Sequence, residues 1–394
     1  MSSVLDPYIP LLEYLAVWVA IFVVAVLLKA DKHGIIAKPY YLMLKTVVFN
    51  AWIEKLGSRF RKAWLTYFDI GAAMGIGLLI FVIISFILNA YNLVNHPAQS
   101  GPALLIVPLP GITISWAIFP YILISIAVLL IPHEIAHGIA SVIDKVPLKS
   151  SGVFLGVFLP GGFVEIDEED LAKRKARTKL RVFAAGSYTN VITWFLVILV
   201  LSNFAASVSP LYNSNPSGVL ITGLVNGGPA QNASIPAWSV LTGVNGSSIM
   251  SVNALRNELA PLAPGHHLNL TIGGTIYMIV TQPSPSNSSR ATIGIFTFDY
   301  YQPRASFLPI SGPYHFFNTL QWMSLILLGV ALVNMLPMVP FDGDRYFDTV
   351  LGLLGLKNPK KVKTVRTATS LISLGLLLSN LLLSYLQFGT IFPK

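Results

Sequence analysis

The chain has 394 residues, of which 54% are hydrophobic and only 11% are charged, and its mean hydropathy is +0.67. A soluble domain carries about 25% charged residues, so this composition excludes a soluble globular protein and predicts a polytopic membrane protein. Cysteine is absent, which excludes disulfides and thiolate metal sites and leaves His, Asp and Glu as metal ligands. The net charge of +9 would suit a nucleic-acid-binding protein, but its distribution along the chain argues against that class.

Six segments are apolar and long enough to cross a bilayer, which requires roughly 20 residues. They are predicted at 10–28, 69–94, 118–143, 182–206, 316–341 and 367–388. Three loops, at 29–62, 145–181 and 345–366, carry 22 of the 26 Lys and Arg residues. Positive loops stay in the cytoplasm, so the charge indicates topology and no nucleic-acid partner is expected. Both termini are then expected outside a cell membrane.

The first apolar segment has no basic region before it and no small-residue cleavage site after it, so we expect a true span. The basic loop that follows includes IEKLGSRFRKAW (53–64). We interpret this stretch as an amphipathic helix at the membrane interface. Residues 1–94 are therefore predicted to form two N-terminal spans joined by a basic cytoplasmic loop.

The third span contains VLLIPHEIAHGIASVI (128–143), in which two histidines and a glutamate interrupt an apolar run. Ionisable side chains at membrane depth are destabilising and usually functional. His133 and His137 are four residues apart and share one helix face. In the pattern H-E-x-x-H, two such imidazoles bind zinc and the adjacent carboxylate, here Glu134, acts as a general base. The alternative is a chance pair of histidines at a membrane interface.

A zinc site in a hydrolase needs a third protein ligand and an open position for water. The fifth span ends in NMLPMVPFDGDRYF (334–347), where prolines break the helix; broken backbone at this depth is tolerated where it lines a cavity. Asp342 is the predicted third ligand, because the third and fifth spans run in the same direction and place it level with the histidines. Asp344 is the alternative ligand, and its other expected role is a solvated helix cap or a partner for Arg345. Asp348 is expected to be a surface charge.

Residues 207–313, between the fourth and fifth spans, are rich in Gly, Pro, Asn, Ser and Thr. Alternating segments such as LNLTI (268–272) and IYMIV (276–280) are bounded by turn residues and predict short strands. The length suits one small β-rich domain outside the membrane. Four N-x-S/T sequons lie in this segment, so possible glycosylation sites are Asn232, Asn245, Asn269 and Asn287.

Two separated motifs resemble those of the site-2 protease family of intramembrane zinc metalloproteases. The family patterns are H-E-x-x-H and N-x-x-P-x-x-P-x-D-G, and every fixed position is present, at His133, Glu134, His137, Asn334, Pro337, Pro340, Asp342 and Gly343. The resemblance implies a zinc metalloendopeptidase with one Zn²⁺ per chain. Its expected partners are the lipid bilayer and, as substrates, single-span transmembrane proteins cut in regulated intramembrane proteolysis.

The segment GVFLGVFLPGGFVEI (152–166) is similar to the membrane re-entrant β-hairpin of that family, with Gly152, Pro160, Gly161 and Gly162 as its marker residues. In the family this element is thought to hold an unwound substrate as an added strand, a mode that supplies backbone hydrogen bonds. The alternative is an ordinary cytoplasmic hairpin with a Pro-Gly-Gly turn.

AAGSYTN (184–190) resembles the glycine-plus-asparagine motif of the family, with Ser187 where bacterial members usually have proline. The resemblance implies that Asn190 lies near the substrate carbonyl. Asn334 is a second candidate for positioning the substrate or stabilising the oxyanion. The alternative role of Asn190 is a hydrogen bond to a neighbouring helix.

The outer segment GLVNGGPAQNASIPAWSVLTGVNG (223–246) resembles a PDZ domain, with Trp238–Ser239 in place of the usual Gly-Asp. The predicted fold is thus an α-helical polytopic membrane protein of about six transmembrane helices with an inserted β-rich, PDZ-like extracytoplasmic domain. The expected parts are an N-terminal pair of spans at 1–94, the first part of the catalytic core at 118–206, the insert at 207–313, and the second part of the catalytic core at 316–394.

Two other functions are compatible with these motifs. A metal-binding membrane transporter would use the same residues as a transit site, but transporters usually contain internal repeats, and the two halves of this chain differ in motif and loop character. A catalytically inactive membrane scaffold with a working PDZ-like domain would not need Glu134. The intact motif therefore favours the protease.

Overall fold

The structure, a computed structural model, describes residues 9–158, 160–285 and 287–392. The chain divides into two compact units. The first consists of Met1–Val197 and Trp322–Lys394, and the second is Ile198–Gln321. Each unit is described by itself below.

The helices that build the first unit differ widely in length. They are α1 (Ile9–Leu27), α2 (Val48–Arg59), α3 (Arg61–Asn95), α4 (Phe119–Val142), α5 (Glu168–Lys173), α6 (Ala176–Ser202), α10 (Gly312–Asn334), α11 (Asp342–Leu353) and α12 (Pro359–Phe388), with short 3₁₀ turns at Ala30–His33 and Pro97–Gln99. Helices α6 and α10 extend into the second unit. Within the described residues, six helices are long and apolar enough to cross a membrane: α1, α3, α4, α6, α10 and α12. The prediction of a six-span helical protein is confirmed.

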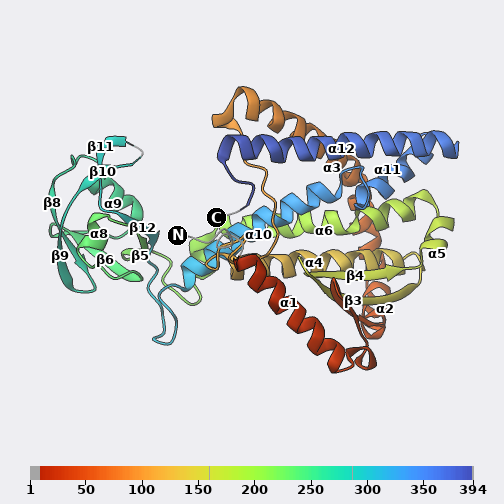
Figure 1. Cartoon of the computed structure of the whole chain (residues 1–394), viewed down its shortest axis with the longest axis horizontal. Helices are drawn as coiled ribbons and strands as arrows, with labels where there is room; N and C mark the ends of the chain where they lie inside the picture. The colour runs from red at the N-terminus through yellow and green to blue at the C-terminus, as the bar shows by residue number, and fades with distance from the viewer. Residues whose placement is uncertain (1–8, 159, 286, 393–394) are drawn as a thin grey trace. The chain divides into compact units, whose positions relative to one another are not determined.

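Several helices begin or end away from the predicted span limits. Helix α12 begins at Pro359 rather than 367, because Asn358 caps it by accepting the backbone N–H groups of Lys360 and Lys361. Hydropathy marks only the apolar part of a helix, so a capped basic first turn is missed. Helix α10 ends at Asn334, before the predicted limit of 341. Proline has no backbone N–H to donate, so Pro337 and Pro340 cannot continue the helix. Helices α3 and α12 lie side by side (Figure 1), joined by Asn89 and Asn380.

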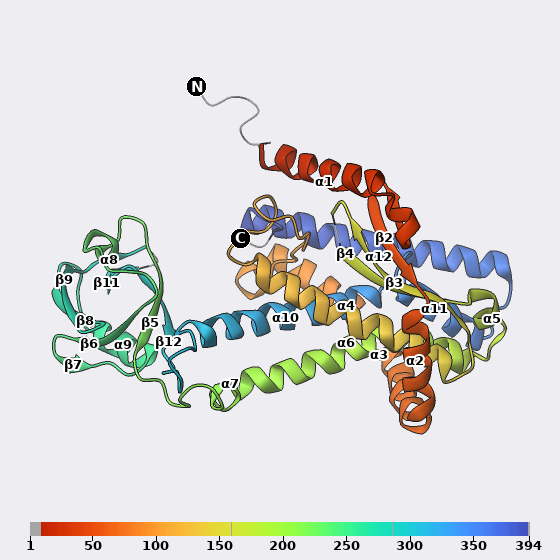
Figure 2. The same cartoon turned by 90° about the horizontal axis from the view of Figure 1, so that it is seen from below.

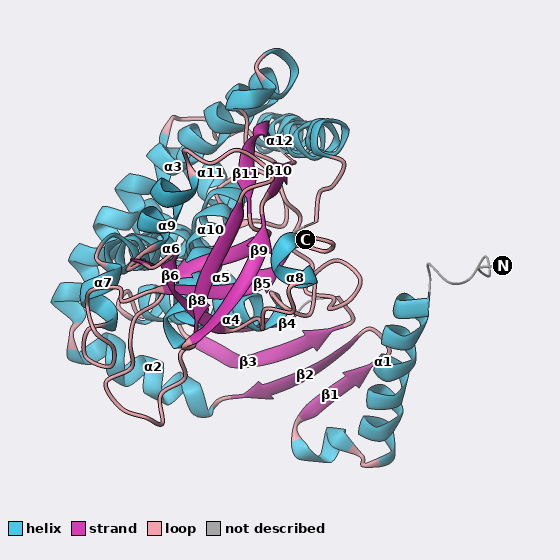
Figure 3. Ribbon diagram, turned by 90° about the vertical axis from the view of Figure 1, so that its left-hand side faces the viewer, coloured by secondary structure: helices cyan, strands magenta, loops and turns pink. Residues whose placement is uncertain are grey.

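A four-stranded antiparallel sheet packs within the first unit, in the order β1 (Ile35–Lys38), β2 (Tyr41–Thr46), β3 (Leu148–Gly156) and β4 (Pro160–Ile166). The structure contains the β3–β4 hairpin, but its Pro-Gly-Gly sequence is not a turn, since Gly161 and Gly162 pair with Phe154 and Val153 inside the sheet. Strands β1 and β2 were not predicted. Figure 3 shows them beside β3, where Gly152 is required because a Cβ would lie 2.0 Å from the Leu44 carbonyl oxygen.

Helix α1 is attached to this sheet by two side chains. The Tyr14 hydroxyl donates to the carbonyl of Val157, the residue after β3, and the Trp18 indole donates to the Pro39 carbonyl between β1 and β2 at 2.7 Å. The rest of α1 is largely exposed. The N-terminal segment and the hairpin are therefore one connected piece of structure.

The predicted interfacial helix at 53–64 is wrong in its limits. Phe60 interrupts it, so that the segment is divided between α2 and α3. Ile53 of α2 is completely buried and packs against Gly138 of α4, where a Cβ would approach the Ile53 side chain to 3.0 Å. The apolar face of α2 is thus directed at least partly toward the protein.

Four charged side chains tie α3, α4 and α6 together. Arg181 of α6 donates to Asp69 of α3 at 2.7 Å and to Asp144, which follows α4, at 2.9 Å. Arg177 binds the second oxygen of Asp69 at 2.6 Å. Since charges removed from water are stable only when paired, this network fixes the ends of three helices.

The second unit is an inserted β-rich domain. Its main sheet has the order β12-β5-β6-β8-β9, with β7 beside β6, and β10 pairs with β11 separately. The strands are β5 (Val219–Leu224), β6 (Ser239–Val244), β7 (Ser247–Ser248), β8 (His267–Ile272), β9 (Thr275–Val280), β10 (Gln282–Ser284), β11 (Asn287–Thr292) and β12 (Ile295–Asp299), and the helices are α7 (Phe204–Val208), α8 (Pro229–Asn232) and α9 (Val252–Leu259). The alternating residues of LNLTI fill its core, because Leu268, Leu270 and Ile272 are buried and Asn269 is exposed. The predicted β-rich insert is confirmed.

Replacing Arg181 by alanine should lower the stability of the protein strongly. It leaves Asp144 without its cation, whereas Asp69 keeps Arg177, and removing one partner of a buried ion pair typically costs about 3–5 kcal/mol. We expect a clearly lower thermal midpoint for the detergent-solubilised variant, measured by size-exclusion chromatography after heating. Arg177→Ala is the matched control, because that side chain is 71% exposed against 8% for Arg181, and exposed ion pairs contribute little. Equal losses in both variants would contradict the assignment.

Candidate active site

Helix α4 presents His133 and His137 on one face, one turn apart, and both side chains are buried. Their Nε2 atoms lie 3.2 Å apart. Two ring nitrogens at this separation point at a common position, which is the arrangement expected of two ligands of one ion.

Asp342 completes this cluster as the first residue of α11. Its Oδ2 atom lies 3.1 Å from Nε2 of His137 and 3.5 Å from Nε2 of His133. Among the described residues, these three form a group whose ligand atoms all lie within 4.8 Å of one another. Two imidazole nitrogens and one carboxylate oxygen are a donor set that suits a catalytic zinc site with one open position.

The turn between α10 and α11 brings Asp342 to the histidines. Residues 335–341 are not helical, and the Val339–Pro340 peptide bond is cis. Gly343 is required next to Asp342, because a Cβ there would lie 2.4 Å from the carbonyl oxygens of Met335 and Leu336. The turn can therefore fold back tightly on the start of α11.

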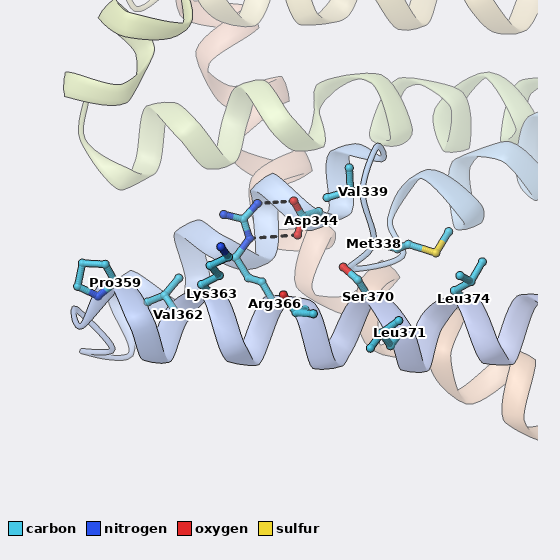
Figure 4. Close-up of a pocket in the computed structure, with 11 residues that line it drawn as sticks. Met338, Val339, Asp344, Pro359, Val362, Lys363, Arg366, Ser370, Leu371 and Leu374 are labelled. Atoms are coloured by element: carbon cyan, nitrogen blue, oxygen red, sulfur yellow. Dashed lines mark hydrogen bonds and ion pairs between the residues drawn. The ribbon is translucent and has the colours of Figure 1, made fainter.

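Asp344 lies in a different environment, although it is only two residues from Asp342. It is 3% exposed and forms a two-pronged ion pair with Arg366 of α12, shown in Figure 4. The expected solvated cap or pairing with Arg345 is wrong, since Arg345 pairs with Glu168 instead. Asp348 is a surface charge at 3.4 Å from Arg366. The structure thus directs Asp342 to the histidines and Asp344 to α12.

Helix α6 runs beside α4 (Figure 2) and contacts both histidines from a single face. The Val182 carbonyl oxygen is 2.8 Å from Nδ1 of His137, and the Asn190 Nδ2 atom is 2.9 Å from Nδ1 of His133. Gly186 lies between them, and a Cβ on it would be 2.4 Å from the His133 ring. Positions 182, 186 and 190 recur every four residues, so they form one stripe along the helix.

Glu134 and Asn334 flank the histidines. The Glu134 Oε2 atom accepts a hydrogen bond from the backbone N–H of Val164 in β4 at 3.1 Å, and Gly162 lies against its Cγ. Asn334, the last residue of α10, places Nδ2 3.4 Å from Nε2 of His133. The hairpin is therefore part of the wall around the cluster.

A cavity of about 600 Å³ opens onto these side chains. Val164, Val182, Phe183 and Phe341 give it apolar walls, and charged residues such as Lys149, Glu165, Glu168 and Arg345 line it as well. A hydrogen-bonded ion pair with Lys45 and a hydrogen bond from Ser150 hold the pKa of Glu165 below its usual value. The cavity therefore has a mixed lining, in which charged and apolar side chains both surround the cluster.

Three contacts in this site were not predicted from the sequence: the Val182 carbonyl, the Val164 N–H and the close approach of Gly186. The first two are backbone groups, which leave no residue-type signal. Gly186 is four residues before Asn190, so helical spacing would have placed both on one face.

Six membrane-length helices together with a cluster of two buried histidines and the half-buried Asp342 indicate an integral membrane protein with a candidate metal site. The chain belongs to peptidase family M50, the site-2 protease family, whose sequence model matches residues 121–378.

Two relatives extend the comparison. The chain is 27% identical over 179 residues to a membrane-bound transcription factor site-2 protease homolog of Arabidopsis thaliana, a match that covers 45% of this chain and 34% of that protein. It is 25% identical over 346 residues to an uncharacterized protein of Methanocaldococcus jannaschii, covering 87% and 86% of the two chains. The chain thus aligns with about a third of the plant protein and with most of the archaeal one.

Among solved structures, the PDZ domain of an SdrC-like protein from Listeria innocua matches 22% of this chain and 98% of its own length, at 17% identity and a TM-score of 0.19. A TM-score this low carries no argument about the fold. The PDZ-like character of the insert stays a prediction, whereas its β-rich fold rests on its own strands.

Exchanging each aspartate for asparagine separates the two candidates for third ligand. We expect Asp342→Asn to lose bound zinc, measured by elemental analysis after dialysis, because an amide oxygen is a much weaker ligand than a carboxylate. Asp344→Asn should keep zinc but lower the thermal midpoint, since it weakens the contact with Arg366. Zinc lost from Asp344→Asn and kept in Asp342→Asn would reverse the assignment.

Proposed function

We propose that this protein is an intramembrane zinc metalloprotease that hydrolyses peptide bonds within or near the transmembrane segments of single-span membrane proteins. The observation that supports it best is the convergence of His133, His137 and Asp342 inside a cavity that Glu134 also lines. Membership of family M50 supports the peptidase activity. Glu134 and Asn334 beside the cluster would supply the remaining parts of the mechanism.

The three cluster residues would hold the metal, and Glu134 would move the proton. Zinc bound there would act as a Lewis acid that polarises the scissile carbonyl and activates water near neutral pH. Glu134 takes the proton of the attacking water and delivers it to the leaving amine. Its hydrogen bond with the Val164 N–H would hold the carboxylate at the cavity. Asn334, on the Nε2 side of His133, is the amide best placed to stabilise an oxyanion.

The β3–β4 hairpin would hold the substrate in an extended form. A helical substrate must unwind, because its carbonyls are otherwise engaged in internal hydrogen bonds. Strand β4 is the last strand of its sheet, and its outer edge faces Glu134. Backbone groups at such an edge can pair with an added strand. A substrate strand at this edge would lie next to the general base.

We place both termini and the insert outside the cell membrane, since 22 of the 26 basic residues then lie in cytoplasmic loops. The insert would act in regulated intramembrane proteolysis as a size filter that favours substrates already trimmed on the outer side.

Neutralising the general base should abolish cleavage without removing the metal. For Glu134→Gln we expect a rate about 10²–10⁴-fold lower on a single-span test substrate in proteoliposomes, with zinc content unchanged, because the cluster ligands are intact. Glu54→Gln is the control, since Glu54 is exposed on α2. Full cleavage by Glu134→Gln would overturn the mechanism.

The outside location of the insert can be read from its sequons. All four asparagines, Asn232, Asn245, Asn269 and Asn287, are exposed, so an oligosaccharyltransferase could reach them if the insert enters the lumen of the secretory pathway. Expression in eukaryotic cells should give a protein that migrates faster after enzymatic deglycosylation. A variant with all four changed to Gln should show no shift. An unchanged wild-type protein would argue against this orientation.

A further inference from the structure

We infer that Asn190 is a positioning residue for the metal ligand His133, whose Nδ1–H it holds, rather than a group that binds the substrate carbonyl. The inference rests on the metal site of the proposed function. It assigns to Asn190 the role of hydrogen-bond acceptor.

The first observation is where the Asn190 side chain lies. It is 0% exposed, and its amide contacts His133 Nδ1 at 2.9 Å. The opposite ring nitrogen of His133, Nε2, faces Asp342 and His137. The imidazole therefore separates the Asn190 amide from the cluster, and a substrate bound at the cluster would meet Asn334 first.

The second observation is the protonation that this geometry requires. A histidine that binds a metal through Nε2 is neutral and carries its hydrogen on Nδ1, so Nδ1 must meet an acceptor. His137 meets this need with the Val182 carbonyl oxygen at 2.8 Å. For His133, the group at Nδ1 is the Asn190 amide.

The third observation identifies which atom of the Asn190 amide accepts the hydrogen bond from His133. Asn190 Oδ1 is buried and has no hydrogen-bond partner, while Nδ2, a donor, faces Nδ1. A half-turn of the amide about its Cβ–Cγ bond exchanges the two atoms. Oδ1 then accepts the Nδ1–H of His133, so that this buried acceptor gains a partner, and Nδ2 takes the position that Oδ1 had.

Gly186 adds a steric restraint to this hydrogen bond. A Cβ at Gly186 would lie 2.4 Å from the His133 ring, so the ring packs directly against the α6 backbone at this residue. The contacts of its face with Gly186 and of its Nδ1 with Asn190 restrain the imidazole in this orientation. Nε2 is thereby aimed at the position shared with His137 and Asp342.

The test compares zinc affinity among three variants of the full chain, purified in detergent, by competition with a chelator. Asn190→Leu removes the acceptor and should weaken zinc binding about 10–100-fold, the usual effect of losing such a partner. Asn190→Asp offers only acceptor atoms and should stay within a few-fold of wild type. Thr189→Val is the control, because it removes a neighbouring hydrogen bond of α6, the one with Tyr67, without touching the cluster.

Cleavage kinetics of the same proteins at saturating zinc provide the second readout. We expect kcat to fall in Asn190→Leu with KM little changed, and Asn190→Asp to recover kcat. Wild-type zinc affinity in Asn190→Leu together with a raised KM would assign the residue to the substrate and overturn the inference. Zinc affinity as weak in Asn190→Asp as in Asn190→Leu would also overturn it, since Asn190 would then act as a donor.

These outcomes separate the inference from the proposed function. If Asn190→Leu binds zinc weakly but wild-type protein cleaves no membrane substrate, the positioning role stands and the protease proposal fails. If wild-type protein cleaves and Asn190→Leu binds zinc normally, only the inference fails. Should Asn190→Leu not fold, the comparison of Asn190→Asp with wild type decides.

Discussion

The structure depends on one constraint: two imidazoles must be buried beside a half-buried carboxylate in a helix bundle, with a partner for each ring nitrogen. Unpaired polar groups are strongly unfavourable at this depth. Helix α6 meets the constraint with the Val182 carbonyl and the Asn190 amide, and the turn after α10 meets it by returning Asp342 to α4. These helices are thus placed so that each histidine has a hydrogen-bond partner at Nδ1 and the Asp342 carboxylate at Nε2.

Arginine side chains pair with the other aspartates of these helices. Asp344 is held by Arg366, and Asp69 and Asp144 are held by Arg181. Asp342 alone among these four aspartates faces histidines. Since a carboxylate paired with arginine is a poor ligand for a second cation, the arginines select which aspartate remains for a metal. This selection explains how two aspartates so close in sequence have separate roles.

The sequence predicted the parts of the fold and site that depend on residue type. Hydropathy predicted six spans, and the H-E-x-x-H spacing together with the later aspartate predicted which side chains meet. It did not predict β1 and β2, because their short segments lie in a basic loop without clear alternation. Nor could it predict the contacts of Val182 and Val164, which are made by backbone atoms, or the partner of Asp344, which depends on how α11 packs on α12. Asn190 was found by resemblance, but its contact with His133 is a matter of three-dimensional packing.

The N-terminal strands β1 and β2 belong to the same sheet as the β3–β4 hairpin. Because β2 pairs along most of β3 from residues 41–46 to 151–156, the hairpin beside Glu134 is an interior part of a sheet on one side and an edge only on the other. Removing the segment before α2 would uncover a second edge, and bare edges of this kind invite non-specific strand pairing. Strands β1 and β2 thus cover one side of the β3–β4 hairpin and leave β4 as its single free edge, the edge at which the proposed substrate strand would pair.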